Sequence, residues 1–164
     1  MSQVIAQNMI DHREDTQQGR FLTFSIESET YGIDIRYVIE IVGIQPITVM
    51  PEFPDYIRGI INLRGEIVPV MDVRLRFKKT FRKYDGRTCI IVIDAKGSSV
   101  GLIVDSVSEV LDIPEQDIVP PPEMNRSGQR YLRAIGKTQD GIKLLLDCEK
   151  MLSDEELESL ENLG

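Results

Sequence analysis

The sequence has few of the residues from which most active sites are built. Among its 164 residues there is no tryptophan, there are two cysteines, and there is a single histidine. His12 lies in a polar stretch, and Cys89 and Cys148 stand in separate apolar surroundings without metal-ligand spacing. We therefore expect two buried free thiols, no metal site and no hydrolase that depends on a histidine base.

Long apolar runs and a basic charge balance are missing as well. No run is long enough to cross a bilayer, and residues 1–19 lack the basic-then-apolar layout of a signal peptide. The net charge of −8 and the aromatic content of 6% argue against general nucleic-acid binding. The composition predicts a cytoplasmic protein with no nucleic-acid partner and no direct membrane insertion.

The sequence contains no convincing motif for catalysis or cofactor binding either. The sequence has neither a glycine-rich phosphate loop with its lysine nor a dinucleotide fingerprint. Gly97–Gly101 matches the pattern GxSxG, but no histidine follows it and the match straddles a predicted hairpin. No catalytic residue, cofactor or metal is predicted, and the protein is expected not to be an enzyme.

An internal repeat predicts the architecture. Residues Tyr56–Phe77 align without a gap over Tyr131–Leu152, at an offset of 75 residues (131 minus 56). Upstream, Tyr31–Val42 align over Val100–Leu111 at an offset of 69 (100 minus 31). The identical pairs are Tyr56/Tyr131, Arg58/Arg133, Ile60/Ile135, Ile67/Ile142, Asp72/Asp147, Gly32/Gly101, Val38/Val107 and Glu40/Glu109.

Each copy reads as two hairpins joined through a proline-bearing loop, with about five short strands. A small closed barrel suits such strands, because closure removes exposed edges. We predict a mainly β domain at 19–152 made of two tandem five-stranded barrels with short helices, lobe one at about 20–80 and lobe two at about 88–152. Residues 1–18 are predicted to form a flexible tail and residues 153–164 a C-terminal helix. The repeat leaves open whether the lobes exchange strands.

Asp72 and Asp147 occupy the same place in the two copies, directly after an apolar run. A carboxylate there can accept hydrogen bonds from the free amides of a following helical turn. A catalytic acid in each copy is the alternative. Because both copies carry the aspartate, the capping role is favoured.

The quoted stretches carry a family resemblance. EFPDYIRGIINLRGEIVPVMDVRLRF (52–77), with FLTFSIESETYGIDIRYVIEI (21–41) and VGLIVDSVSEVLDI (100–113), resembles the CheW-type chemotaxis coupling proteins. The likeness covers about Phe21 to Leu160 and implies two SH3-like barrels, which agrees with the repeat. It also implies a non-catalytic scaffold that couples the cytoplasmic tips of methyl-accepting chemoreceptors to the regulatory domain of the histidine kinase CheA. Such a protein would be recruited from the cytoplasm to membrane-bound receptor arrays.

The copies differ at one hairpin tip, and this difference suggests a binding site. Asn62-Leu63-Arg64-Gly65 stands where the second copy has Lys137–Asp140, so the Leu-Arg loop is not needed merely to close a barrel. By resemblance, a receptor helix lies in a groove between the lobes and touches this loop. The implied receptor-binding residues are Val38, Glu40, Ile41, Asn62, Leu63, Arg64, Gly65, Val104 and Val107. Val38 and Val107 hold equivalent places in the copies, so a role in the core is an equal alternative for them.

A kinase-binding surface must lie away from that groove if one molecule is to bridge two partners. By resemblance, the ends of the barrels pair with the kinase regulatory domain. The implied residues are Ile44, Val49, Gly59, Glu123 and Met124. Packing inside lobe one is the alternative for Ile44 and Val49.

Other interpretations remain open from the sequence, among them an enzyme that uses Ser99 or the paired carboxylates. A small β-barrel that binds a ligand or an oligonucleotide is one, although low aromatic content disfavours it. A regulatory module derived from CheV or CheA is another. The basic run from Arg74 to Arg87 is either a solvated connection or a dock for an acidic partner.

Overall fold

The computed structural model describes residues 17–123 and 130–152. Most of the predicted N-terminal tail, the predicted C-terminal helix and Met124 lie outside the described residues.

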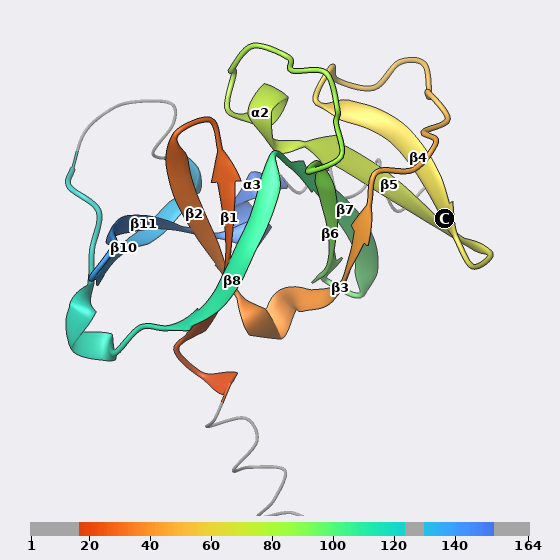
Figure 1. Ribbon diagram of the computed structural model, residues 1–164. Helices are drawn as coiled ribbons and strands as arrows, with labels where there is room; N and C mark the ends of the chain where they lie inside the picture. The colour runs from red at the N-terminus through yellow and green to blue at the C-terminus, as the bar shows by residue number, and fades with distance from the viewer. Residues whose placement is uncertain (1–16, 124–129, 153–164) are drawn as a thin grey trace, which may run out of the picture.

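The described chain is built mainly of short strands, which confirms the mainly β class (Figure 1). Three short helical turns, η1 (Ile35–Tyr37), α2 (Val73–Arg76) and α3 (Cys148–Met151), follow strands, and η2 (Glu115–Asp117) lies in a loop. The strands are β1 (Arg20–Ile26), β2 (Glu29–Asp34), β3 (Val38–Gly43), β4 (Ile57–Leu63), β5 (Glu66–Asp72), β6 (Cys89–Ala95), β7 (Ser98–Val104), β8 (Ser106–Asp112), β9 (Ile118–Val119), β10 (Leu132–Thr138) and β11 (Gly141–Leu146).

The strands form two sheets that lie side by side in Figure 1. The first has the order β8-β1-β2-β11-β10-β9, and the second has the order β3-β6-β7-β5-β4. The first sheet counts six strands where five were predicted, because the two-residue β9 pairs with β10. In the second sheet the corresponding contact is a single bridge between Thr48 and Ile60.

The two repeats exchange hairpins. The β1–β2 hairpin of the first repeat joins strands β8 to β11, and the β6–β7 hairpin of the second repeat joins strands β3 to β5. Both junctions are parallel pairings, β11 with β2 and β5 with β7. The bounds 20–80 and 88–152 therefore describe repeats in the sequence, whereas each sheet takes strands from both repeats.

The pairing of equivalent residues confirms the repeat. Leu145 lies opposite Gly32 in one sheet, and Val70, its equivalent at the offset of 75, lies opposite Gly101 in the other. A Cβ at either glycine would press on a side chain of the paired strand, at 3.0 Å from Leu145 and 2.9 Å from Val70. Small residues at both places let the parallel strands approach.

The hydrogen bonds at the two helical turns repeat as well. The backbone N–H of Asp72 donates to the carbonyl of Tyr56 at 2.7 Å, and that of Asp147 donates to the carbonyl of Tyr131 at 2.8 Å. Asp72 accepts from the amides of Arg74 and Leu75, and Asp147 accepts from two amides in the same way. The capping role predicted for both aspartates is confirmed.

One hydrophobic core runs through both sheets. Strand β6 is buried on both faces, since Ile91 and Ile93 pack in the cluster shared by the sheets while Ile90 and Val92 pack in a second cluster. A β-branched run suits such a doubly covered strand. The shared cluster unites residues of both repeats, so the two lobes pack on a common core.

A buried arginine joins the two repeats. The guanidinium of Arg76 lies 4.5 Å from the ring centre of Tyr56 and 4.7 Å from that of Tyr131, and its Nε donates to the carbonyl of Met151 at 2.8 Å. Cation–π contacts of this kind contribute about 1–2 kcal/mol when desolvated. This side chain therefore fixes α2 against α3.

Candidate functional site

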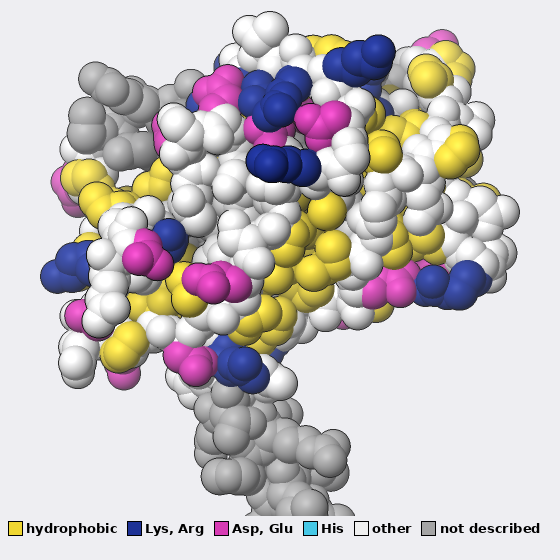
Figure 2. Space-filling view, in the orientation of Figure 1, with side chains coloured by type: hydrophobic (Ala, Val, Ile, Leu, Met, Phe, Trp, Pro, Cys, Tyr) yellow, Lys and Arg dark blue, Asp and Glu magenta, His cyan; other side chains and the backbone are white. Residues whose placement is uncertain are grey.

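An apolar surface lies between the edge strands of the two sheets, β3 and β8, and we call it the inter-sheet surface. It consists of Val38, Ile39 and Ile41 of β3 with Val107 and Val110 of β8. Figure 2 shows hydrophobic side chains gathered at the centre of this face, between the two sheets of Figure 1. Val38 and Val107 are half-buried and pack on the same core cluster. The other three are more exposed, at 54% for Ile39, 43% for Ile41 and 40% for Val110.

The repeat explains why these residues share one face. Ile41 lies opposite Ile91, and Val110, its equivalent at the offset of 69, lies opposite Leu22. Ile91 and Leu22 both belong to the shared core cluster. Ile41 and Val110 thus extend that core to the surface from two directions.

The hairpin tip at Arg64 adjoins β3 through an ion pair. Arg64 Nη2 lies 2.7 Å from Glu40 Oε2 and also donates to Oε1. The Arg64 side chain is 72% exposed, whereas that of Glu40 is 28% exposed. Glu40 therefore holds one terminal nitrogen of a guanidinium that still faces solvent.

The backbone at this tip is that of a two-residue hairpin loop. Leu63 pairs with Glu66, and the two residues between them have positive φ, 51° at Arg64 and 89° at Gly65. Asn62 Oδ1 accepts from the Gly65 N–H at 2.7 Å and closes the turn. Positive φ suits glycine, asparagine or aspartate, so an arginine in the first position costs about 1 kcal/mol. Turn formation does not explain this arginine.

Two of the residues assigned to the receptor site by resemblance are buried instead. Leu63 is 6% exposed and Val104 is 1% exposed, and both pack in core clusters. Strand β7 has core on both faces, which leaves Val104 no face toward solvent. We therefore remove Leu63 and Val104 from the candidate contact surface and retain Asn62 and Gly65 as exposed parts of the turn.

The residues assigned to the kinase side have different environments. Val49 is 76% exposed and Glu123 is exposed, whereas Ile44 is half-buried against the second core cluster. Gly59 is buried with φ of 143°, and a Cβ there would lie 2.0 Å from the carbonyl oxygen of Thr48. The close approach at Gly59 is thus an internal one, between β4 and the Thr48 bridge, and not an approach of a partner.

The sequence interpretation missed Ile39 and Val110. A bulge between Val38 and Glu40 turns Ile39 outward and breaks the simple alternation of β3. Val110 could have been found, because the offset of 69 makes it the counterpart of Ile41.

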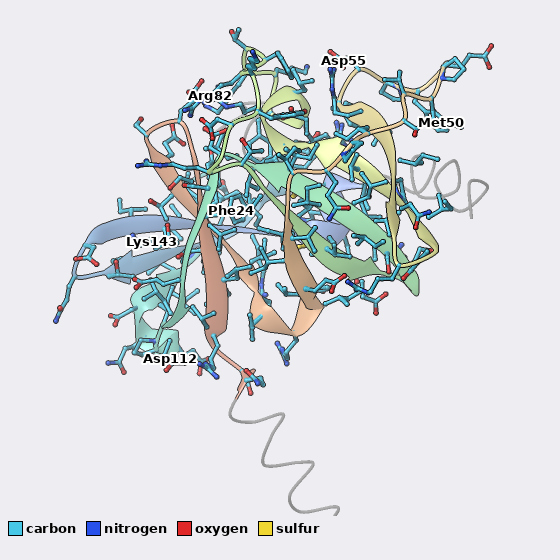
Figure 3. All side chains as sticks on the ribbon, turned by 45° about the vertical axis from the view of Figure 1, so that its right-hand side comes forward. Phe24, Met50, Asp55, Arg82, Asp112 and Lys143 are labelled. Atoms are coloured by element: carbon cyan, nitrogen blue, oxygen red, sulfur yellow. The ribbon has the colours of Figure 1, made fainter. Side chains whose placement is uncertain are left out.

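An ion network lies at the end of the molecule that carries α2, where Figure 3 labels Arg82. Arg74 donates to both carboxylate oxygens of Asp105 at 2.7 Å and lies 3.2 Å from Glu27. Burial works to raise the pKa of Asp105, but hydrogen bonds from Arg74 and the Glu27 amide outweigh it and hold the pKa below its usual value. These contacts tie α2 to both sheets, and they pair part of the basic run internally.

The described residues offer little for catalysis. No three histidine, cysteine, aspartate or glutamate side chains among them are placed to hold a metal ion. Burial raises the pKa of the Cys148 thiol to about 12, so this thiol stays protonated and unreactive. Ser99 lies within strand β7 of the β6–β7 hairpin and not at a strand-to-helix turn. No helix in the described part of the chain is long and apolar enough to span a membrane.

Comparisons with known proteins agree with this picture of a binding surface without catalytic groups. Residues 20–156 match the family model described as CheW-like domain. The chain is 39% identical over 151 residues to the chemotaxis protein CheW of Klebsiella aerogenes, covering 92% of this chain and 91% of that protein. It is 31% identical over 154 residues to the chemotaxis protein CheW of Treponema pallidum, covering 90% and 89%.

A solved structure shares the fold. The crystal structure of the scaffolding protein TtCheW from Thermoanaerobacter tengcongensis superposes with a TM-score of 0.78 at 37% identity, covering 84% of this chain and 94% of that one. The two sheets with few short helices match the two SH3-like barrels of this fold. The chain belongs to the CheW-like domain family and is a non-catalytic chemotaxis scaffold.

Proposed function

We propose that the chain couples chemoreceptors to the histidine kinase CheA by binding a receptor helix on the inter-sheet surface and the kinase regulatory domain at the barrel ends. The observation that carries this proposal is the exposed apolar inter-sheet surface of β3 and β8, together with the exposed Arg64, which pairs with Glu40 of the same strand β3. Apolar side chains next to a positioned arginine are typical of protein-binding hot spots. Family membership favours this role over a ligand- or oligonucleotide-binding barrel.

The exposed apolar side chains of the inter-sheet surface support the proposed receptor contact. Ile39, Ile41 and Val110 are exposed apolar side chains, and exposing them to water does not stabilise the free protein. Exposed apolar patches of this kind mark interaction sites. An amphipathic receptor helix can cover this area with one apolar stripe and place a carboxylate or a backbone carbonyl on Arg64. Glu40 keeps the guanidinium in place before binding, which lowers the entropy lost on association.

The kinase side lies on other residues. Val49 is the most exposed large hydrophobic side chain in the described part of the chain, and it belongs to the segment between β3 and β4. Glu123 lies on the loop after Pro122 and is exposed. We assign these two residues to the kinase surface, and Met124 remains part of that assignment by its sequence position. Recruitment of the protein to receptor arrays would follow from the receptor contact.

Binding of receptor fragments to matched variants tests the receptor half of the proposal. Ile41→Asp and Val110→Asp each place a charge in the inter-sheet surface, so we expect co-sedimentation with receptor signalling fragments to fall at least about tenfold. Ile142→Asp is the control, because Ile142 is 62% exposed on β11 and lies outside that surface. Equal binding by all three variants would show that the receptor does not use this face.

Kinase binding tests the second half. Val49→Asp is expected to weaken binding of the isolated regulatory domain of the kinase and to leave receptor co-sedimentation unchanged. Its control is Thr48→Asp, an exposed neighbour whose backbone already bridges to Ile60. Loss of both activities in folded Val49→Asp would contradict the separation of the two surfaces.

A further inference from the structure

A bulge in β8 brings two residues of the inter-sheet surface onto one face of the strand. Val107 lies opposite Phe24 of the neighbouring strand β1. Val110, three residues further along β8, lies opposite Leu22, which is only two residues from Phe24. Phe24 and Leu22 both pack in the shared core cluster, so the residues opposite them point to that same side of the sheet. Residues three apart in a regular strand would point to opposite faces. The two valines therefore share a face because of the bulge.

The side chain of Thr23 closes this bulge. Thr23 lies on β1 between the two paired positions, and β8 lies beside β1 at the edge of its sheet (Figure 1). The Thr23 hydroxyl donates to the carbonyl of Glu109 at 2.8 Å and accepts from the Glu109 N–H at 3.2 Å. Thr23 is 1% exposed, whereas Glu109 is exposed. One hydroxyl in the core thus bonds both backbone polar groups of a bulge residue at the surface.

The two repeats hold the equivalent bulge residue in different ways. Glu40 and Glu109 correspond at the offset of 69, and each lies in a bulge of an edge strand. Glu40 stays in the ladder opposite Val92, and its carboxylate is bound by Arg64. The equivalent hairpin tip of the second repeat has no arginine. Glu109 is held instead through its backbone, by the Thr23 hydroxyl.

We propose that Thr23 is a positioning residue for receptor recognition, because its hydroxyl holds the bulge that presents Val107 and Val110 together. The inference rests on the proposed receptor contact at the inter-sheet surface, and it adds a buried residue that the receptor does not touch. Without the hydroxyl, β8 samples other backbone shapes at the bulge, and only a fraction of the molecules present both valines. The apparent affinity for the receptor then falls by that fraction.

Amide hydrogen exchange tests the hold on β8 in the absence of receptor. The Glu109 N–H is bonded to Thr23, so it should exchange slowly although the residue is exposed. Thr23→Val removes this acceptor and should speed exchange at Glu109 by about fivefold or more. The Gly65 N–H, which is bonded to the Asn62 side chain, is the control and should exchange equally in both proteins. Unchanged exchange at Glu109 in Thr23→Val would overturn the proposal.

Receptor titrations with two variants separate positioning from packing. Thr23→Val keeps the buried volume and lacks the hydroxyl, and a valine fits because Val92, the counterpart of Thr23 at the offset of 69, is 2% exposed. Thr23→Ser keeps the hydroxyl and lacks a buried methyl group. We expect the affinity for a receptor signalling fragment to fall about fivefold in Thr23→Val and to stay within about twofold of wild type in Thr23→Ser. A role in packing alone would weaken the two variants alike, and equal affinities would therefore overturn the positioning role.

Val110→Asp distinguishes a failure of this inference from a failure of the proposed receptor contact. If Val110→Asp loses receptor binding while Thr23→Val binds as wild type does, the receptor contact stands and the positioning role is overturned. If Val110→Asp binds as wild type does, the receptor does not use this face, and both proposals are contradicted. Should Thr23→Val fail to fold, Thr23→Ala takes its place, because it also removes the hydroxyl and needs no added space.

Discussion

Glu40 on the edge strand β3 and Arg64 at the tip of the β4–β5 hairpin form an ion pair, with Arg64 Nη2 2.7 Å from Glu40 Oε2. The pair is exposed on the arginine side, so it contributes little to folding, about 0.5 kcal/mol or less. The pair instead fixes the position of Arg64, because Glu40 holds one nitrogen of the guanidinium while the rest of the group stays open to a partner.

The pair predicts a non-additive double-mutant cycle for receptor binding. Arg64→Ala should weaken binding by about 2 kcal/mol, which is about thirtyfold, because it removes the anchor. Glu40→Ala should weaken binding less, since it only frees the anchor to move. The double variant should lose less than the sum, measured by titration with a receptor signalling fragment. Strictly additive losses would remove the pairing from the binding mechanism.

Arg64 also predicts a trade between stability and binding. Its φ of 51° is disfavoured for arginine and free for glycine, so Arg64→Gly should raise the free energy of unfolding by about 0.5–1 kcal/mol. The same change should abolish the arginine contact and weaken receptor binding. Urea denaturation of both proteins checks the first effect, with Lys96→Gly as a control at a hairpin loop of similar φ, 52°. A less stable Arg64→Gly would show that the turn is not strained.

The two capping aspartates should differ in their contribution to stability. Asp72 is 1% exposed and accepts from the Tyr84 hydroxyl as well as from helix amides, whereas Asp147 accepts from amides only among the described contacts. Asp147→Ala should cost about 1 kcal/mol for the lost cap. Asp72→Ala should cost about 3 kcal/mol, because the part-buried Tyr84 hydroxyl also loses its partner. Thermal denaturation that gives equal losses would contradict the added role of Tyr84.

The Arg74–Asp105 pair predicts a defined acid sensitivity. The folded-state pKa of Asp105 lies below the unfolded value of about 3.9, so the folded protein binds fewer protons near pH 4. The contribution of Asp105 to stability is therefore present above pH 4 and is lost as the pH falls through the folded pKa. Asp105→Asn should be less stable at pH 7 by about 2 kcal/mol, because Arg74, at 10% exposure, loses its two short contacts and keeps only the longer ones to Glu27 and the Thr80 carbonyl. The difference in the free energy of unfolding between wild type and Asp105→Asn should shrink below pH 4. A difference that stays constant as the pH falls would show that the Arg74–Asp105 pair is not the source of the acid sensitivity.

Much of the fold could be predicted from the repeat, but the exchange of hairpins could not. The offsets identify equivalent residues such as Tyr56 and Tyr131, and their hydrogen bonds to Asp72 and Asp147 repeat as expected. They do not say which copy supplies a neighbouring strand. Val70 pairs with Gly101 of the second repeat, but the sequence around it would equally allow pairing with Gly32 of the first repeat. Only packing across the whole core decides between the two pairings.

The candidate site was predictable where the repeats differ. Arg64 stood out because the second copy has no arginine at that tip, and the structure leaves it exposed. Val104 was misplaced because the sequence does not reveal that β7 has core on both faces. Ile39 was missed because a bulge cannot be read from the alternation of β3.

Co-sedimentation of the kinase regulatory domain with receptor signalling fragments, in the presence and absence of this protein, tests the coupling role most directly. We expect the kinase domain to sediment with receptor only when the wild-type protein is added, and we expect both Arg64→Glu and Val49→Asp to lose this coupling. Arg64→Glu should still bind the kinase domain alone, and Val49→Asp should still bind receptor alone. Sedimentation of the kinase domain at the same level without the protein, or with Arg64→Glu in its place, would contradict the proposal that this chain is the bridge.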